Sequence, residues 1–175
     1  MSARDIGRDL QAVYEAMEAS DASRQYSERH GIGAQAVLTV HDDETADLIC
    51  ERFHERLAGK TVVEIGGGIG LLALHVGLIA KRVYCIEANP MWSWVFAGTL
   101  LRHKPKNVSF LFGAADEFVG AIKGDVAIYC THSGVGSMRL VAAQFAPEVI
   151  DVHGEMIAAN PQFYDPVASE LRKVV

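Results

Sequence analysis

The sequence has few cysteines, and they are arranged neither as a disulfide framework nor as a metal site. Only Cys50, Cys85 and Cys130 occur in 175 residues, and no CxxC pair is present. An odd number of scattered cysteines is typical of small core residues in a reducing compartment. The sequence therefore favours a cytoplasmic protein without structural disulfides.

Long apolar runs and a basic excess are also missing. The longest apolar run, residues 70–80, is too short to span a bilayer and contains a histidine, and the first residues show no signal-peptide pattern. The net charge is −6, whereas nucleic-acid-binding domains usually carry a basic face. These absences exclude a membrane-spanning helix and weigh against a nucleic-acid partner.

Half of the residues are hydrophobic, and the length suits one domain with a sizeable core. From about residue 60 onward, short apolar runs alternate with helical patterns. Runs that are apolar nearly throughout are typical of strands covered on both faces, and their alternation with helices predicts a parallel sheet. The predicted strands are 61–66, 82–88, 108–113, 125–130 and 148–158, and the predicted helices are 70–81, 90–103, 115–123 and 137–146.

Two further helices are predicted ahead of this region. Residues 4–29 carry apolar side chains at helical spacing, beginning with Leu10. The second helix should begin after Asp42 or Asp43, because either carboxylate can cap free N–H groups, and should end at Gly59. Its expected buried stripe is Ala46, Ile49, Cys50, Phe53 and Leu57.

Glycines are crowded immediately after the first predicted strand, in the stretch VVEIGGGIG (residues 62–70). A triphosphate-binding loop is excluded, because no Lys-Ser or Lys-Thr follows the glycines. The dinucleotide pattern GxGxxG read from Gly66 places Leu71 where a third Gly or Ala belongs. Read from Gly68, the pattern ends at Ala73, but the turn then lies too far into the helix.

A third pattern, ExGxGxG, fits Glu64, Gly66, Gly68 and Gly70, and here the sequence resembles the class I, or Rossmann-like, S-adenosylmethionine-dependent methyltransferases. The resemblance covers roughly residues 60–158. It implies a three-layer α/β/α sandwich with a mainly parallel sheet in strand order 3-2-1-4-5, and S-adenosylmethionine as the cofactor.

The resemblance also implies which residues bind the cofactor. Glu87 ends the second predicted strand, where a carboxylate can accept both ribose hydroxyls. Glu64 should lie near the methionine part and, as a carboxyl in an apolar strand, should have a partner. In the family an acid after the third strand lies by the adenine, and Ala114 holds that position here. Either Asp116 acts from two residues on or backbone groups of Ala115 and Asp116 do; the alternative is that Asp116 caps a short helix. The remaining expected contacts are Gly66, Gly67, Gly68, Gly70, Ala88 and Ala115.

Catalytic residues are less constrained by sequence, because methyl transfer depends largely on alignment. The loop over residues 130–137 follows the fourth predicted strand, where the family places the methyl acceptor. Its best general-base candidate is His132, with a purely structural histidine as the alternative. The [DN]PP[FYW] motif of amino-group nucleic-acid methyltransferases is absent, which weighs against base methylation. No metal ligands are assigned.

The predicted organisation is one domain, with a helical cap over residues 1–59, a Rossmann-like core over 60–158 and a tail over 159–175. Only 17 residues follow Ala158, so the hairpin that ends the family's sheet is expected to be trimmed. The leading hypothesis is a methyltransferase with a small-molecule acceptor. A non-catalytic S-adenosylmethionine-binding protein and a nicotinamide-dependent oxidoreductase remain as alternatives, and a homo-oligomer is left open.

Overall fold

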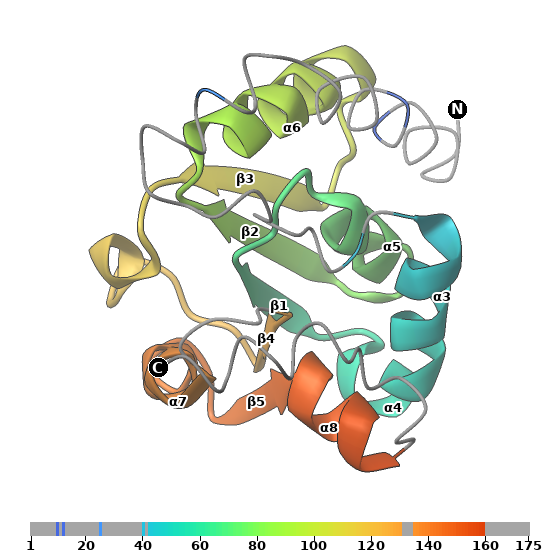
Figure 1. Cartoon of the computed structure of the whole chain (residues 1–175), viewed down its shortest axis with the longest axis vertical. Coiled ribbons are helices and arrows are strands. Elements are labelled where there is room, and N and C mark those ends of the chain that lie inside the picture. Colours follow the sequence, from blue (N-terminus) through green and yellow to red (C-terminus); the bar gives the residue numbers. More distant parts are fainter. Residues whose placement is uncertain are drawn as a thin grey trace.

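The computed structural model describes residues 42–130 and 135–159, together with Leu10, Ala12, Gln25 and Val40. Its centre is a parallel sheet of five strands in the order β3-β2-β1-β4-β5 (Figure 1). This order confirms the predicted fold class. The strands are β1 (Thr61–Ile65), β2 (Arg82–Glu87), β3 (Val108–Phe112), β4 (Val126–Tyr129) and β5 (Glu148–Asp151).

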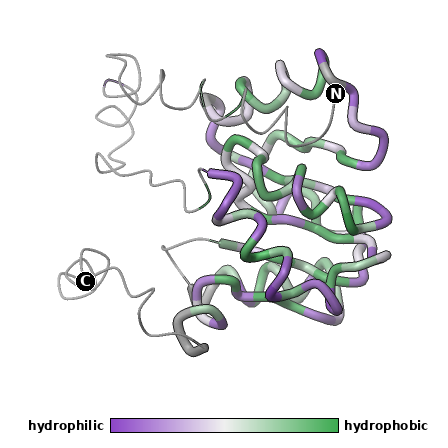
Figure 2. The backbone as a smooth tube through the Cα atoms, turned by 90° about the vertical axis from the view of Figure 1, so that its right-hand side faces the viewer, coloured by the Kyte–Doolittle hydropathy of each residue, from purple (hydrophilic) through white to green (hydrophobic). Residues whose placement is uncertain are grey.

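Helices cover both faces of this sheet, so the fold has three layers (Figure 1). One buried cluster joins one face of the sheet to α3, α5, α6 and α8, and a second joins the other face to α7 and η1. Figure 2 shows the hydrophobic residues running through the middle of the fold. The helices are α3 (Asp43–Arg52), α4 (His54–Leu57), α5 (Leu71–Ile79), α6 (Pro90–His103), the 3-10 helix η1 (Ala115–Phe118), α7 (Val135–Ala142) and α8 (Val152–Ala159).

The predicted helix starts agree closely with the structure. Asp42 is the N-cap of α3, and its carboxylate accepts a hydrogen bond from the Thr45 backbone N–H at 2.7 Å. The helix is interrupted at Phe53, where ψ is 15°, but Leu57 N still donates to Phe53 O at 3.1 Å. The apolar residues before and after the interruption therefore stay on the same face. All five residues of the predicted buried stripe are buried.

The predicted strand over residues 148–158 is wrong beyond Asp151. The chain turns there into α8, because Asp151 Oδ1 accepts the Gly154 backbone N–H at 2.9 Å in the manner of an N-cap. Val152 and Met156 then lie one helical turn apart and both pack on the core. The apolar residues that follow Asp151 therefore form one face of a helix rather than a strand.

The chain ends are described only in part. Leu10, Ala12 and Gln25 are helical, and Leu10 is fully buried. The rest of the predicted helix over 4–29, and the tail from residue 160 onward, lie outside the described residues. No helix in the described part of the chain has the length and apolar character needed to cross a membrane.

A buried histidine joins α5 to α3. His75 is 1% exposed; its Nε2 lies 2.7 Å from Asp43 Oδ1 and its Nδ1 lies 3.0 Å from Asp47 Oδ1. The ring therefore lies between two carboxylates of neighbouring turns of α3 and connects the two helices. The sequence pattern suggested a cap for Asp43 and indicated neither Asp47 nor this bridge.

We expect His75→Ala to lower the free energy of unfolding by about 3 kcal/mol, because it removes the buried side-chain contacts to Asp43 and Asp47 and leaves a cavity. Urea denaturation measures this difference. His54→Ala on α4 is the matched control, since His54 is exposed and its loss should change stability by less than about 0.5 kcal/mol. Equal effects of the two substitutions would show that the bridge contributes nothing.

Candidate cofactor site

The glycine-rich stretch forms a tight turn from β1 into α5 at the carboxyl edge of the sheet. Gly66, Gly68 and Gly70 have φ angles of 72°, 57° and 83°, which side chains disfavour. The backbone N–H groups of Gly66 and Gly67 donate to Ile86 O at 2.9 and 3.0 Å. The turn is thereby fixed against the end of β2, where ligands bind in open α/β sheets.

Glu87 lies at that end of β2 and contacts the turn directly. Its Oε2 accepts the Gly68 N–H at 2.7 Å, and its Oε1 accepts the Asn89 N–H at 2.6 Å. Burial raises the pKa of this carboxyl, while hydrogen bonds from the backbone of Asn89, Gly68 and Ala88 act in the opposite direction. The predicted acid and the predicted turn are thus parts of one hydrogen-bonded site.

Glu64 lies beneath the same turn. It is 4% exposed, and its Oε2 has no hydrogen-bond partner among the residues that the structure describes. Burial raises its pKa to about 8, the Cys85 thiol opposes this rise, and the charge of Glu87 adds to it. The hydrogen-bond partner of this carboxyl is the Cys85 thiol, which is a weak donor, and burial favours the protonated form of the acid.

This raised pKa gives a stability prediction for the protein without ligand. The folded state holds a proton that the unfolded state loses above a pKa of 4.5, so stability due to Glu64 is complete below pH 4.5 and is lost as the pH rises to about 8. Native protein should therefore lose up to a few kcal/mol over this range relative to Glu64→Gln. Urea denaturation at pH 5.5 and pH 8 measures it. Parallel pH profiles for both proteins would contradict the prediction.

The expected adenine side lies at the ends of β2 and β3. Gly113 N donates to Glu87 O at 3.1 Å, and the exposed Ala88 follows directly. Ala115 and Asp116 begin η1, whose N-cap is Ala114 without a side-chain hydrogen bond. The capping role considered for Asp116 is therefore wrong. Its carboxylate is exposed, and its contact with the adenine stays a prediction.

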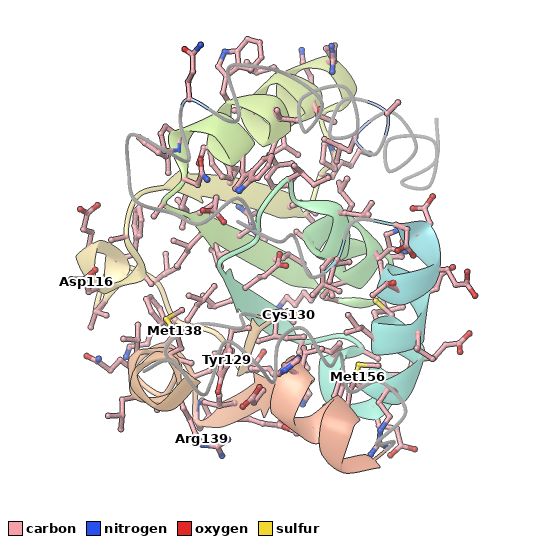
Figure 3. All side chains as sticks on the ribbon, in the orientation of Figure 1. Asp116, Tyr129, Cys130, Met138, Arg139 and Met156 are labelled. Carbon is pink, nitrogen blue, oxygen red and sulfur yellow. The ribbon has the colours of Figure 1, made fainter. Side chains whose placement is uncertain are left out.

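The carboxyl ends of β4 and β5 bring together groups that the sequence pattern did not indicate. Tyr129 and Asp151 are register partners, and the exposed Arg139 of α7 lies nearby (Figure 3). The pKa of Tyr129 is raised to about 12. Burial is the largest cause, Asp151 contributes in the same direction, and Arg139 acts to lower the pKa. Tyr129 is therefore a phenol at neutral pH. His132, the predicted base, lies outside the described residues.

The residues present fit S-adenosylmethionine in two respects. A carboxylate has about four acceptor positions. Backbone N–H groups of three residues occupy three of the positions on Glu87, which leaves one for a ribose hydroxyl. The turn contributes backbone at the N-terminus of α5, whose positive potential suits a carboxylate. Glu64, beneath that backbone, is the acid available to a cationic group.

No family model matches this sequence, and no curated protein matches it. Solved structures do share its fold. A proposed RNA methyltransferase from Pyrococcus horikoshii has 19% identity and a TM-score of 0.52, with 66% of this chain and 64% of that chain covered. A precorrin-6y C5,15-methyltransferase from Geobacter metallireducens has 16% identity and a TM-score of 0.54, with 63% and 60% covered.

A third similar structure is a precorrin-8w decarboxylase from Methanobacterium thermoautotrophicum, with 23% identity, a TM-score of 0.51 and coverage of 71% and 73%. The chain thus spans less than two thirds of the first two proteins. These likenesses confirm that the chain has the fold of the class I S-adenosylmethionine-dependent methyltransferases, as the sequence resemblance implied. At such identities the likeness establishes the fold, and activity must be argued from the site.

Proposed function

We propose that this chain is an S-adenosylmethionine-dependent methyltransferase acting on a small-molecule acceptor. The observation that carries the proposal is the hydrogen bond between Glu87 Oε2 and Gly68 N. It joins a strand-end acid to a glycine turn at the carboxyl edge, which is the combination needed to hold a ribose beside a backbone-bound amino acid group. The acceptor class rests on the net charge of −6 and on the missing base-methylation motif.

The residues of the chain would mainly bind and align. When bound, the cofactor supplies an electrophilic methyl group on a sulfonium centre. Glu87 would accept a ribose hydroxyl, and the backbone of the glycine turn would hold the amino acid part. Because in-line displacement depends on proximity and orientation, this positioning can account for much of the rate.

Tyr129 and Asp151 lie where an acceptor would approach, at the ends of β4 and β5. A Tyr129 hydroxyl with a pKa of about 12 is a hydrogen-bond donor rather than a base at neutral pH. If the acceptor must lose a proton, His132 is the candidate base. A His132→Ala variant with full activity would remove that role.

Isothermal titration calorimetry with S-adenosylmethionine, S-adenosylhomocysteine and NAD tests the cofactor assignment. We expect the first two to bind and NAD to fail. NAD binding alone would support the oxidoreductase alternative and contradict the proposal. Methyl transfer from labelled S-adenosylmethionine to a panel of small acceptors then tests the activity; binding without transfer to any acceptor would favour the non-catalytic alternative.

A further inference from the structure

Two acidic side chains are buried beneath the glycine turn, but their oxygens are satisfied unequally. Glu87 accepts backbone N–H groups through both carboxylate oxygens, at 2.7 and 2.6 Å. Glu64 Oε2 accepts none within the described part of the chain. Hydrogen bonds from N–H groups stabilise a carboxylate as an anion, and burial without them favours the neutral acid. Burial therefore raises the pKa of both carboxyls, and backbone N–H groups oppose that rise only at Glu87.

Of the groups that face Glu64, the Cys85 thiol favours its ionised form and the Glu87 carboxylate favours its protonated form. From β2 it meets the Cys85 thiol and the Glu87 carboxylate, and from α3 it acts on the Cys50 thiol. Its register partner on β4, Ile128, is apolar. The pKa of Cys50 is about 12 and that of Cys85 is well above its ordinary value, in both cases mainly through burial. Neither thiol ionises near neutral pH, and within residues 42–130 and 135–159 no cation contributes to the pKa of Glu64.

Gly67 brings the backbone of the turn close to this acid. A Cβ placed on Gly67 would lie 2.1 Å from Cys85 Sγ and 3.2 Å from Glu64 Oε2. The missing side chain thus lets the turn pack directly on the carboxyl. A ligand held against the outer side of the turn would be separated from Glu64 by only one layer of backbone.

We propose that Glu64 is protonated in the empty protein and releases this proton to solvent when S-adenosylmethionine binds. The inference rests on the proposed function, because it assigns a proton transfer to the acid beneath the proposed cofactor turn. The Glu64 O–H bond breaks, the proton passes to the buffer and no electrons are exchanged. The positive charge of the ligand replaces the proton as the counter-charge of the carboxylate.

One positive charge on the ligand is sufficient to shift the Glu64 carboxyl to its ionised form. A positive charge beside a buried carboxyl favours its ionised form, because the attraction is screened less there than in water. Cofactor affinity should therefore rise about tenfold between pH 6.5 and pH 8. Close to one proton should leave per cofactor bound at pH 7, because the carboxyl is mostly protonated below its pKa of about 8.

Calorimetric titration of the full chain with S-adenosylmethionine, in two buffers of different ionisation enthalpy at pH 7, measures the released protons directly. Repeating it between pH 6.5 and pH 8 gives the pH dependence of affinity. Glu64→Gln should bind with nearly no proton release and with a flat pH profile. Glu51→Gln, which neutralises an exposed acid on α3, should release as many protons as the native protein.

The outcomes separate this inference from the proposed function. Binding without proton release, or equal release by native protein and Glu64→Gln, overturns the inference and leaves the cofactor assignment intact. Failure of S-adenosylmethionine to bind at every pH overturns both. Should Glu64→Gln not fold, infrared difference spectra of the native protein decide instead: the carbonyl band of a protonated carboxyl should disappear on binding, and its persistence would overturn the inference.

Discussion

Glu87→Ala is expected to weaken binding of S-adenosylmethionine by about 100-fold or more. A hydrogen bond to a charged group contributes roughly 1.5–3 kcal/mol, which corresponds to about 10-fold to 100-fold in affinity. The substitution also removes the acceptor of the Gly68 and Asn89 N–H groups, so the turn loses its support as well. Calorimetry with S-adenosylmethionine and S-adenosylhomocysteine measures both affinities.

The control for Glu87→Ala is Glu51→Ala, which makes the same change in net charge at an exposed position of α3. Its affinities should stay within about twofold of the native values, because exposed charges are strongly screened. Circular dichroism and urea denaturation would verify that Glu87→Ala is folded. Native affinity in a folded Glu87→Ala protein would show that this acid does not hold the ribose, and the cofactor assignment would lose its main support.

Much of the fold could be predicted because the local patterns and the tertiary packing agree. Asn89-Pro90 marks a helix start in sequence, and α6 begins at Pro90 and ends at His103 as expected. The end of β5 was mispredicted because apolar residues of a helix face can mimic a short strand. The deciding feature there is the hydrogen bond from Gly154 N to the Asp151 carboxylate, and an Asp three residues before a Gly is only a weak indication of it.

The candidate site also has features that the sequence predicts and features that it does not. Glu64, Glu87 and the glycines could be assigned because their spacing along the chain reflects one turn and two neighbouring strand ends. The state of Glu64 could not, because it depends on register: Glu64 is paired across the strands with Cys85, and a thiol is a weak donor. The meeting of Tyr129 and Asp151 likewise depends on the pairing of β4 with β5, which joins residues that are distant in sequence.

Gly70→Ala should lower the free energy of unfolding by about 3 kcal/mol. The backbone of Gly70 has a φ of 83°, which already disfavours a side chain, and a Cβ there would lie 2.3 Å from three atoms of the Phe96 ring. The ring has little room to move, because Phe96 is fully buried and packs edge-on against Phe110 with 5.4 Å between ring centroids. Urea denaturation of the two proteins measures the loss.

Gly98→Ala is the matched control, because it makes the same chemical change within α6. A Cβ on Gly98 meets no atom within 4 Å, and alanine is favoured over glycine in a helix by about 1 kcal/mol. We therefore expect Gly98→Ala to stabilise the protein, which places the two substitutions about 4 kcal/mol apart and with opposite signs. A neutral Gly70→Ala substitution would show that the glycine turn can accept a side chain. The close packing of α6 against this turn would then not be needed for the fold. A loss of S-adenosylmethionine affinity in Gly70→Ala greater than that in Gly98→Ala would link the same packing to binding.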